Sequence, residues 1–169
     1  MQISGIIPVM LTPFQDDGSV DYASLERLTE WYIAHGADAL FAVCQSSEMQ
    51  YLSLAERVEM ARFVVRIARG RVPVVASGHI STGIDDQKAE LAAVAETGVD
   101  GVVLVTNRLD PEAKGTEVFR ASLKALLAAL PPDLPLGLYE CPAPYRRLLS
   151  DDEFKACIDS GRFAMLKDV

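Results

Sequence analysis

The sequence predicts an α/β fold built on a parallel sheet, and three observations support this class. Short apolar runs alternate with longer amphipathic stretches along the whole chain. The apolar runs are rich in Val, Ile and Leu and do not alternate with polar residues, which is typical of strands buried on both faces of a sheet. Each run with its following amphipathic stretch takes about 30 residues, the usual length of a βαβ unit.

Six of the apolar runs are predicted as strands. A predicted helix lies between each strand and the next, so successive strands need a crossover connection and run parallel to one another. In chain order, the predicted strands cover Gly5–Met10, Ala39–Val43, Val72–Ala76, Gly101–Val105, Leu136–Tyr139 and Phe163–Lys167.

The five intervening helices carry start and stop signals. Two of them open with a capping box, formed by Ser53 with Glu56 and by Ser150 with Glu153. A glycine ends four of the helices, and a pair of prolines after Leu130 stops the remaining one. The predicted helices cover Asp21–His35, Ser53–Gly70, Asp85–Thr97, Thr116–Leu130 and Ser150–Gly161.

Composition excludes several classes of protein. The 169 residues are 50% hydrophobic and carry a net charge of −8, which fits a single globular domain over residues 1–169 and argues against nucleic acid or an anionic membrane as a partner. No apolar run reaches the roughly 18 residues of a membrane span, and no secretory signal is expected. Three scattered cysteines suit a reducing cytoplasm, and the lack of paired metal ligands argues against a metal site.

Strand–helix alternation leaves two architectures open, an open doubly wound sheet or part of a closed (β/α)8 barrel. No GxGxxG or Walker A loop follows the first strand, so a nucleotide-binding sheet has little support. A complete barrel needs about 200 residues or more, which exceeds this chain. Both architectures place functional residues where the strands end at their carboxyl side.

Two of these strand ends carry side chains suited to imine chemistry. Lys167 ends an otherwise apolar strand, where burial favours the neutral amine that attacks a ketone. Tyr139 ends the preceding strand, where its phenol can move protons to and from the reacting carbon and oxygen. Taken singly, Lys167 is more simply interpreted as a solvated lysine, and Tyr139 is equally well interpreted as an aromatic ring that packs at the strand end.

Other strand-end residues have weaker signals. Ser46 and Ser47 follow the second strand, where hydroxyls and backbone N–H groups suit a carboxylate, although a helix cap is the simpler interpretation. His79 has no nearby metal-ligand partner and is expected to be structural. Cys44 and Cys141 flank the site without a paired histidine and are interpreted as small buried apolar residues.

Together these residues resemble the dihydrodipicolinate synthase / N-acetylneuraminate lyase family. The resemblance runs the length of the chain, from Gly5-Ile6-Ile7-Pro8 and Thr12-Pro13-Phe14 near the family's amino-terminal pattern to Ser46-Ser47-Glu48, which is similar to the end of its Gly-x-x-Gly-Glu turn. Tyr139-Glu140-Cys141-Pro142 resembles its Tyr-Asn-x-Pro motif. Leu166-Lys167-Asp168 resembles the strand with the Schiff-base lysine.

The resemblance implies a (β/α)8 TIM barrel, of which this chain holds about six strands, and a class I aldolase mechanism. Lys167 would form a covalent imine with pyruvate or a related 2-oxo acid, so no separate cofactor is expected. Tyr139 would relay protons, and Ser46 and Ser47 would hold the substrate carboxylate. Members of such a family are expected to be homo-oligomers.

Departures from the family pattern predict a different substrate from that of the synthases. Gln45 stands where the synthases have a hydroxyl residue of the proton relay, and Arg108 stands where they have a tyrosine reaching a neighbouring subunit's site; both are assigned to substrate binding. Pro144 occupies the position of an arginine for the aldehyde carboxylate, and Arg146 is displaced from it.

The position of the last predicted strand leaves a rival interpretation open. The family continues beyond the lysine strand, so the chain is interpreted as truncated just after Lys167. Six strands leave open edges in an eight-stranded barrel. A catalytically inactive half-barrel, or an α/β binding module with an open sheet, is therefore the alternative to an active aldolase or lyase.

Overall fold

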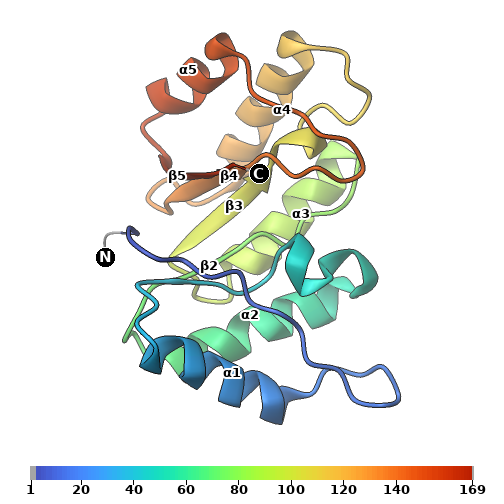
Figure 1. Cartoon of the computed structure of the whole chain (residues 1–169). Coiled ribbons are helices and arrows are strands. Elements are labelled where there is room, and N and C mark those ends of the chain that lie inside the picture. The colour runs from blue at the N-terminus through green and yellow to red at the C-terminus, as the bar shows by residue number, and fades with distance from the viewer. Residues whose placement is uncertain (1–2, 169) are drawn as a thin grey trace.

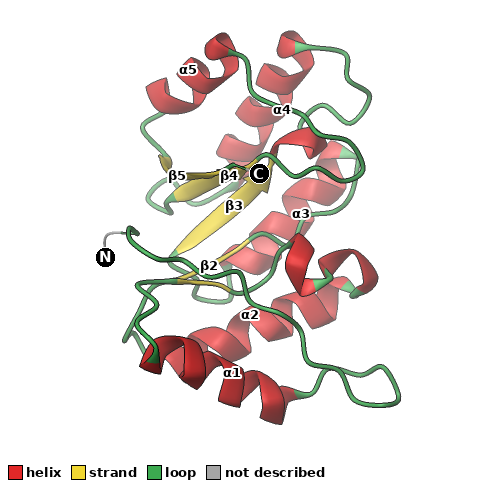
Figure 2. Cartoon of the chain, viewed as in Figure 1, coloured by secondary structure: helices red, strands yellow, loops and turns green. Residues whose placement is uncertain are grey.

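A computed structural model describes residues 3–168 and contains a five-stranded, all-parallel sheet in the order β1-β2-β3-β4-β5 (Figures 1 and 2). The strands are β1 Leu40–Phe41, β2 Val74–Ala76, β3 Gly101–Val105, β4 Leu136–Tyr139 and β5 Phe163–Lys167. The α-helices are α1 Tyr22–Ala34, α2 Leu54–Ala68, α3 Ile84–Ala95, α4 Thr116–Ala129 and α5 Asp151–Asp159, with short 3-10 turns η1 Gln45–Ser47, η2 Met49–Tyr51 and η3 Thr106–Arg108.

The five α-helices form an outer arc around the sheet, and each helix packs against the next one along the chain (Figure 1). Strands adjacent in sequence are also adjacent in the sheet, so the order never reverses as it does in a doubly wound fold. This is the arrangement of a half-barrel. The predicted α/β barrel class is confirmed, and the open doubly wound alternative is not.

The register of the strands separates an inner face from an outer face. Val103 pairs with Gly137, and Gly137 pairs with Met165, so these residues share the inner face. A register shift between Leu136 and Gly137 places two residues of β5 opposite one step of β4. Beyond this shift, Met165 and Lys167 lie on the inner face with β4 residues Gly137 and Tyr139.

The predicted first strand at residues 5–10 is not a regular strand. Val9 forms one isolated parallel bridge with Phe41, supported by the hydrogen bonds from Met10 N to Phe41 O (3.0 Å) and from Phe41 N to Pro8 O (3.0 Å). Pro8 has no N–H to donate, and Gly5 has a φ of 92°, so a continuous ladder does not form. The sheet therefore contains five strands among the described residues. In place of the strand predicted at residues 5–10, an extended segment runs beside β1.

Local signals placed the helices well. Both predicted capping boxes are present, at Ser53 with Glu56 and at Ser150 with Glu153, and the Asp21 side chain caps α1 by accepting from Ser24 N at 3.0 Å. The observed helices are shorter than predicted by one to two residues at most ends, as expected for frayed termini. Within the described residues, no helix is long and apolar enough to cross a membrane.

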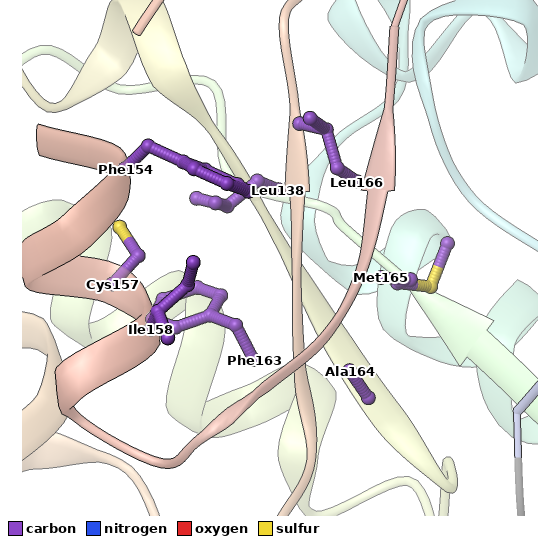
Figure 3. A pocket seen from close by; sticks show the side chains of 8 residues that line it. All are labelled: Leu138, Phe154, Cys157, Ile158, Phe163, Ala164, Met165 and Leu166. Carbon is purple, nitrogen blue, oxygen red and sulfur yellow. The ribbon is translucent and has the colours of Figure 1, made fainter. Parts of the chain in front are cut away.

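Strand β5 lies at one edge of the sheet and is only partly buried, whereas most of the apolar runs were predicted as strands buried on both faces. Leu166 is 43% exposed because no further strand lies beside it in the part of the chain that the structure describes. An apolar groove of about 230 Å³ lies between β5 and α5, lined by side chains that include Phe154, Ile158 and Phe163. Figure 3 shows Phe154 extending from α5 toward Leu138 across this groove.

Candidate active site

Tyr139 and Lys167 end strands β4 and β5 and are register partners across the two strands. Parallel partners point their side chains to the same face, and Lys167 Nζ lies 3.9 Å from the centroid of the Tyr139 ring. A cation within about 6 Å of an aromatic centroid is attracted by the ring. The structure therefore brings together the two residues that the sequence predicts as catalytic.

A cavity borders the amine of this pair. It has a volume of about 240 Å³ and lies between β5 and the N-terminal segment, with Gly5, Ile7, Phe41 and Met165 in its lining beside Lys167. The lining is apolar except for Lys167, which is half-buried at its edge.

The Tyr139 phenol is held in its protonated form. Only 3% of the residue is exposed, and this burial is the main reason that its pKa is raised above the ordinary value. The nearby thiols of Cys141 and Cys44 raise the pKa further. At neutral pH, the Tyr139 hydroxyl is therefore a hydrogen-bond donor beside the lysine.

The two predicted carboxylate-binding serines occupy different environments in η1. Ser47 is fully buried, and its hydroxyl donates to Met10 O at 2.7 Å while accepting from Cys44 N at 3.1 Å. Ser46 is exposed, and its N–H donates to Cys44 Sγ at 3.3 Å. Thr12 Oγ1 donates to Ser47 O at 2.6 Å, so the base of this turn is firmly held. Ser47 thus shapes the turn, and Ser46 presents its hydroxyl at the surface of the turn.

Gln45 and Cys141 join the loops that follow β1 and β4. The Cys141 thiol donates to Gln45 Oε1 at 3.7 Å and lies 3.3 Å from Ala143 O. Cys141 is 1% exposed, and Gln45 is half-buried. Sequence reasoning placed Gln45 at the site and interpreted Cys141 as a small buried residue, which its burial in the core confirms; the contacts of its thiol with two oxygen atoms were not predicted.

Arg108 ends η3, directly after β3, and is half-buried. Its carbonyl oxygen accepts a hydrogen bond from Gln87 Nε2 at 2.9 Å. No hydrogen bond or ion pair among the described residues joins the Arg108 side chain to Tyr139 or Lys167. The structure therefore places Arg108 at the carboxyl edge of the sheet, but no hydrogen bond or ion pair of the described residues joins its side chain to the pair predicted as catalytic.

A second arginine, displaced in the sequence, lies close to the lysine strand. Arg146 Nη2 is 3.7 Å from Asp168 Oδ1, and Asp168 is the residue after Lys167. Both side chains are more than half exposed, so this ion pair contributes about 1 kcal/mol or less to stability. Pro144 follows a cis peptide bond from Ala143 in the same loop. The loop after β4 thus places the Arg146 guanidinium beside the end of β5. Ungapped spacing had pointed to position 144 for such an arginine.

Asn107 fixes the loop after β4 and was not predicted to do so. Its Nδ2 lies within 2.9 Å of the carbonyl oxygens of Cys141 and Ala143 and 2.8 Å from that of Tyr145. Arg147 also holds this loop in place, through ion pairs of 3.3 Å to Asp110 and 2.7 Å to Glu153. An asparagine directly after a buried strand was the signal available in the sequence.

The loop after β2 is held by buried polar side chains. Arg57 and Glu90 form an ion pair at 3.2 Å that is almost completely buried, and Glu90 also accepts from Ile80 N at 3.0 Å. His79 Nε2 accepts from Val105 N at 2.6 Å, and burial lowers the His79 pKa to about 4. The structure supports the structural interpretation of His79. Within residues 3–168, no group of three or more His, Cys, Asp or Glu side chains is placed to hold a metal ion.

Comparison with known proteins identifies relatives of this arrangement. The sequence profile of the dihydrodipicolinate synthetase family matches residues 2–147, a range that includes Tyr139 and ends before Lys167. A 4-hydroxy-tetrahydrodipicolinate synthase from Shewanella sp. (strain W3-18-1) is 37% identical over 142 residues, which is 83% of this chain and 46% of the relative. The chain thus spans about half the length of the curated relatives it matches.

Solved structures extend the match through β5. The dihydrodipicolinate synthase of Acinetobacter baumannii, solved in complex with pyruvate, superposes with a TM-score of 0.87 at 30% identity, covering 99% of this chain and 56% of that one. The DapA-2 synthase of Bacillus anthracis gives a TM-score of 0.86 at 28% identity, with the same coverage. A Clostridium difficile protein in complex with mannosamine shares the fold at 16% identity, with a TM-score of 0.82.

Proposed function

This chain is a member of the dihydrodipicolinate synthetase family, and we propose that it carries the reaction centre of a carbon–carbon lyase. In this proposal, Lys167 forms an imine with pyruvate or a related 2-oxo acid. The observation that carries the proposal is the placement of Lys167 Nζ 3.9 Å from the ring centroid of Tyr139 beside a small cavity. An amine and a phenol so close together are the two groups that imine formation needs.

The proposed reaction begins with addition of the neutral Lys167 amine to the ketone carbon, which gives a carbinolamine. The carbinolamine hydroxyl takes up a proton and leaves as water, and the nitrogen electron pair closes the C=N bond of an iminium. Loss of a proton from the adjacent carbon then moves an electron pair toward nitrogen and gives an enamine. Tyr139 relays these protons, because its hydroxyl donates one proton as its oxygen accepts another.

Substrate binding is assigned to the loops around the pair. The substrate carboxylate is proposed to contact Ser46 and the turn shaped by Ser47, because hydroxyls and backbone N–H groups bind such anions. Gln45 and Arg108 are proposed to contact the second reactant from the loops after β1 and β3. The named complex of the Acinetobacter baumannii relative with pyruvate supports a 2-oxo acid as the first reactant.

Several broader properties belong to the same proposal. The covalent imine supplies the electron sink, so the reaction is proposed to need no metal and no separate cofactor. Three free cysteines suit a cytoplasmic protein, and membership of the family supports assembly into a homo-oligomer. The departures at Gln45, Arg108 and Pro144 favour a substrate other than that of the authentic synthases.

Reductive trapping tests the proposal. Pyruvate and borohydride are added to the full chain, and the modified residue is located by mass spectrometry of peptides. We expect a reduced pyruvyl adduct on Lys167, its loss in Lys167→Arg, and its retention in Lys155→Arg, which changes an exposed lysine of α5. A folded chain that remains unmodified at Lys167 would reject the proposal and favour the inactive half-barrel, which the free edge of β5 also suits.

A further inference from the structure

The thiol of Cys141 links the loops that follow β4 and β1 by a hydrogen bond. It lies two residues beyond the end of β4, and its Sγ donates to Gln45 Oε1 at 3.7 Å. Gln45 belongs to η1, which follows β1, so this hydrogen bond spans the sheet between two loops far apart in the sequence. A thiol that only filled space would have carbon neighbours alone, whereas this one has an oxygen partner on each of two loops.

The position of this thiol is set by the main chain around it. Asn107 donates to the carbonyl oxygen of Cys141 at 2.9 Å and to that of Ala143 at 2.9 Å. The residue is 1% exposed, so the side chain has no solvent to turn into. Asn107, which follows β3, therefore fixes the main chain of Cys141, in addition to the contacts that the thiol itself makes.

Cys141 also neighbours the Tyr139 hydroxyl. Its thiol is near enough to the phenol to raise the Tyr139 pKa, after burial itself. The Lys167 amine lies over the ring of Tyr139. One thiol therefore lies beside the phenol of this pair and hydrogen-bonds to the carboxamide of Gln45 in the η1 turn.

We propose that Cys141 is a positioning residue that orients the Tyr139 hydroxyl and the Gln45 carboxamide for proton transfer at the Lys167 imine. This inference rests on the proposed function. The thiol takes no proton from the substrate. By donating to Gln45 Oε1, it turns the Nε2 donors of Gln45 away from itself. Because Cys141 is buried two residues beyond the end of β4, its side chain also limits the space in which the Tyr139 phenol can turn.

The experiment separates imine formation from the proton transfer that follows it. Borohydride trapping reports the imine, and exchange of the pyruvate methyl protons in deuterium oxide, followed by proton NMR, reports formation of the enamine. Both are measured across neutral and alkaline pH for the wild type, Cys141→Ala and Cys141→Ser. Cys157→Ala is the matched control, because it removes another buried thiol, on α5.

We expect Cys141→Ala to be trapped as fully as the wild type while methyl exchange slows about tenfold, the scale of losing a supporting hydrogen bond at a site. Its alkaline limb should move to lower pH, since one cause of the raised Tyr139 pKa is removed. Cys141→Ser keeps a donor and should recover most of the rate, and Cys157→Ala should match the wild type.

Three outcomes overturn the inference. Exchange in Cys141→Ala at the wild-type rate and with the wild-type pH profile rejects it while leaving the proposed function intact. An equal loss in Cys157→Ala also rejects it, because the effect is then not particular to this thiol. A wild type that is never trapped rejects the proposed function, and the inference falls with it. Near-ultraviolet circular dichroism of each variant verifies the native fold.

Discussion

A β-carbon added to Gly137 would lie 2.7 Å from Met165 Cγ and 3.1 Å from Val103 Cγ2. The three residues come from neighbouring strands on the inner face, so the added carbon meets a side chain on each side. We predict that Gly137→Ala lowers the free energy of unfolding by about 1–3 kcal/mol, the usual range for overpacking. Chemical denaturation of the wild type and the variant measures this difference.

The source of this strain can be isolated with a second substitution. Met165→Ala removes the atom nearest to the added carbon, so the double variant should be more stable than the sum of the two single changes predicts. Additive losses would show that the contact with Met165 is not the cause.

The buried ion pair between Arg57 and Glu90 gives a prediction with a built-in control. Glu90→Ala leaves the Arg57 guanidinium buried without its carboxylate and should cost about 3–5 kcal/mol. Glu59→Ala removes the partner of exposed Arg62 and should cost about 1 kcal/mol or less. Thermal or urea unfolding of both variants distinguishes the two, and equal losses would contradict the structural role given to Glu90.

Stability is predicted to fall between about pH 6.5 and pH 4 because of His79. Its pKa is about 4 in the folded chain, against an ordinary value of 6.5, so the unfolded state binds the proton first as the pH falls. The folded state then loses up to about 3 kcal/mol relative to the unfolded state, and this loss is complete near the folded pKa. Denaturant unfolding across this pH range measures the slope.

Two variants assign that slope to one histidine. His79→Gln should flatten the pH dependence relative to the wild type, because the titrating ring is gone. His35→Gln changes the exposed histidine that stacks on Trp31 and should keep the wild-type slope. A wild-type slope in His79→Gln would show that other groups cause the acid sensitivity.

Tyr139→Phe should separate binding from proton transfer. The ring that lies beside Lys167 is retained, so trapping of pyruvate at the lysine should persist. Loss of the hydroxyl should slow methyl proton exchange by about a hundredfold or more, the scale of general acid–base catalysis. Tyr32→Phe, on α1, is the control and should exchange at the wild-type rate.

Local signals in the sequence were sufficient for the helices and for the proximity of Tyr139 and Lys167. Ser53 and Ser150 mark helix starts because a capping box lies within four consecutive residues. Tyr139 and Lys167 were predicted to meet because parallel strands end at one edge of a sheet, and their register pairing confirms that they do. The segment at residues 5–10 was wrong as a strand, since Pro8 interrupts the hydrogen bonding that apolar content suggested.

Other features depend on contacts that no local pattern encodes. The hydrogen bond between Cys141 and Gln45 joins residues 96 positions apart, and it gives a buried cysteine a polar contact that was not predicted. Ser47 was predicted from its hydroxyl to bind a carboxylate, but the hydroxyl contacts the Met10 carbonyl oxygen brought to it by folding. The carboxylate-binding role of the turn stays a prediction, with Ser46 as its exposed side chain.

Main-chain pairing between β4 and β5 sets Tyr139 and Lys167 side by side at one edge of the sheet. Substitutions in the neighbouring loops can therefore alter which molecules fit while these two main-chain positions stay paired. Evolution within this fold can then keep the sheet that positions Tyr139 and Lys167 while the sequences of the surrounding loops diversify. Gln45 and Arg108, where this chain departs from the synthase pattern, are the places where such diversification would be recorded.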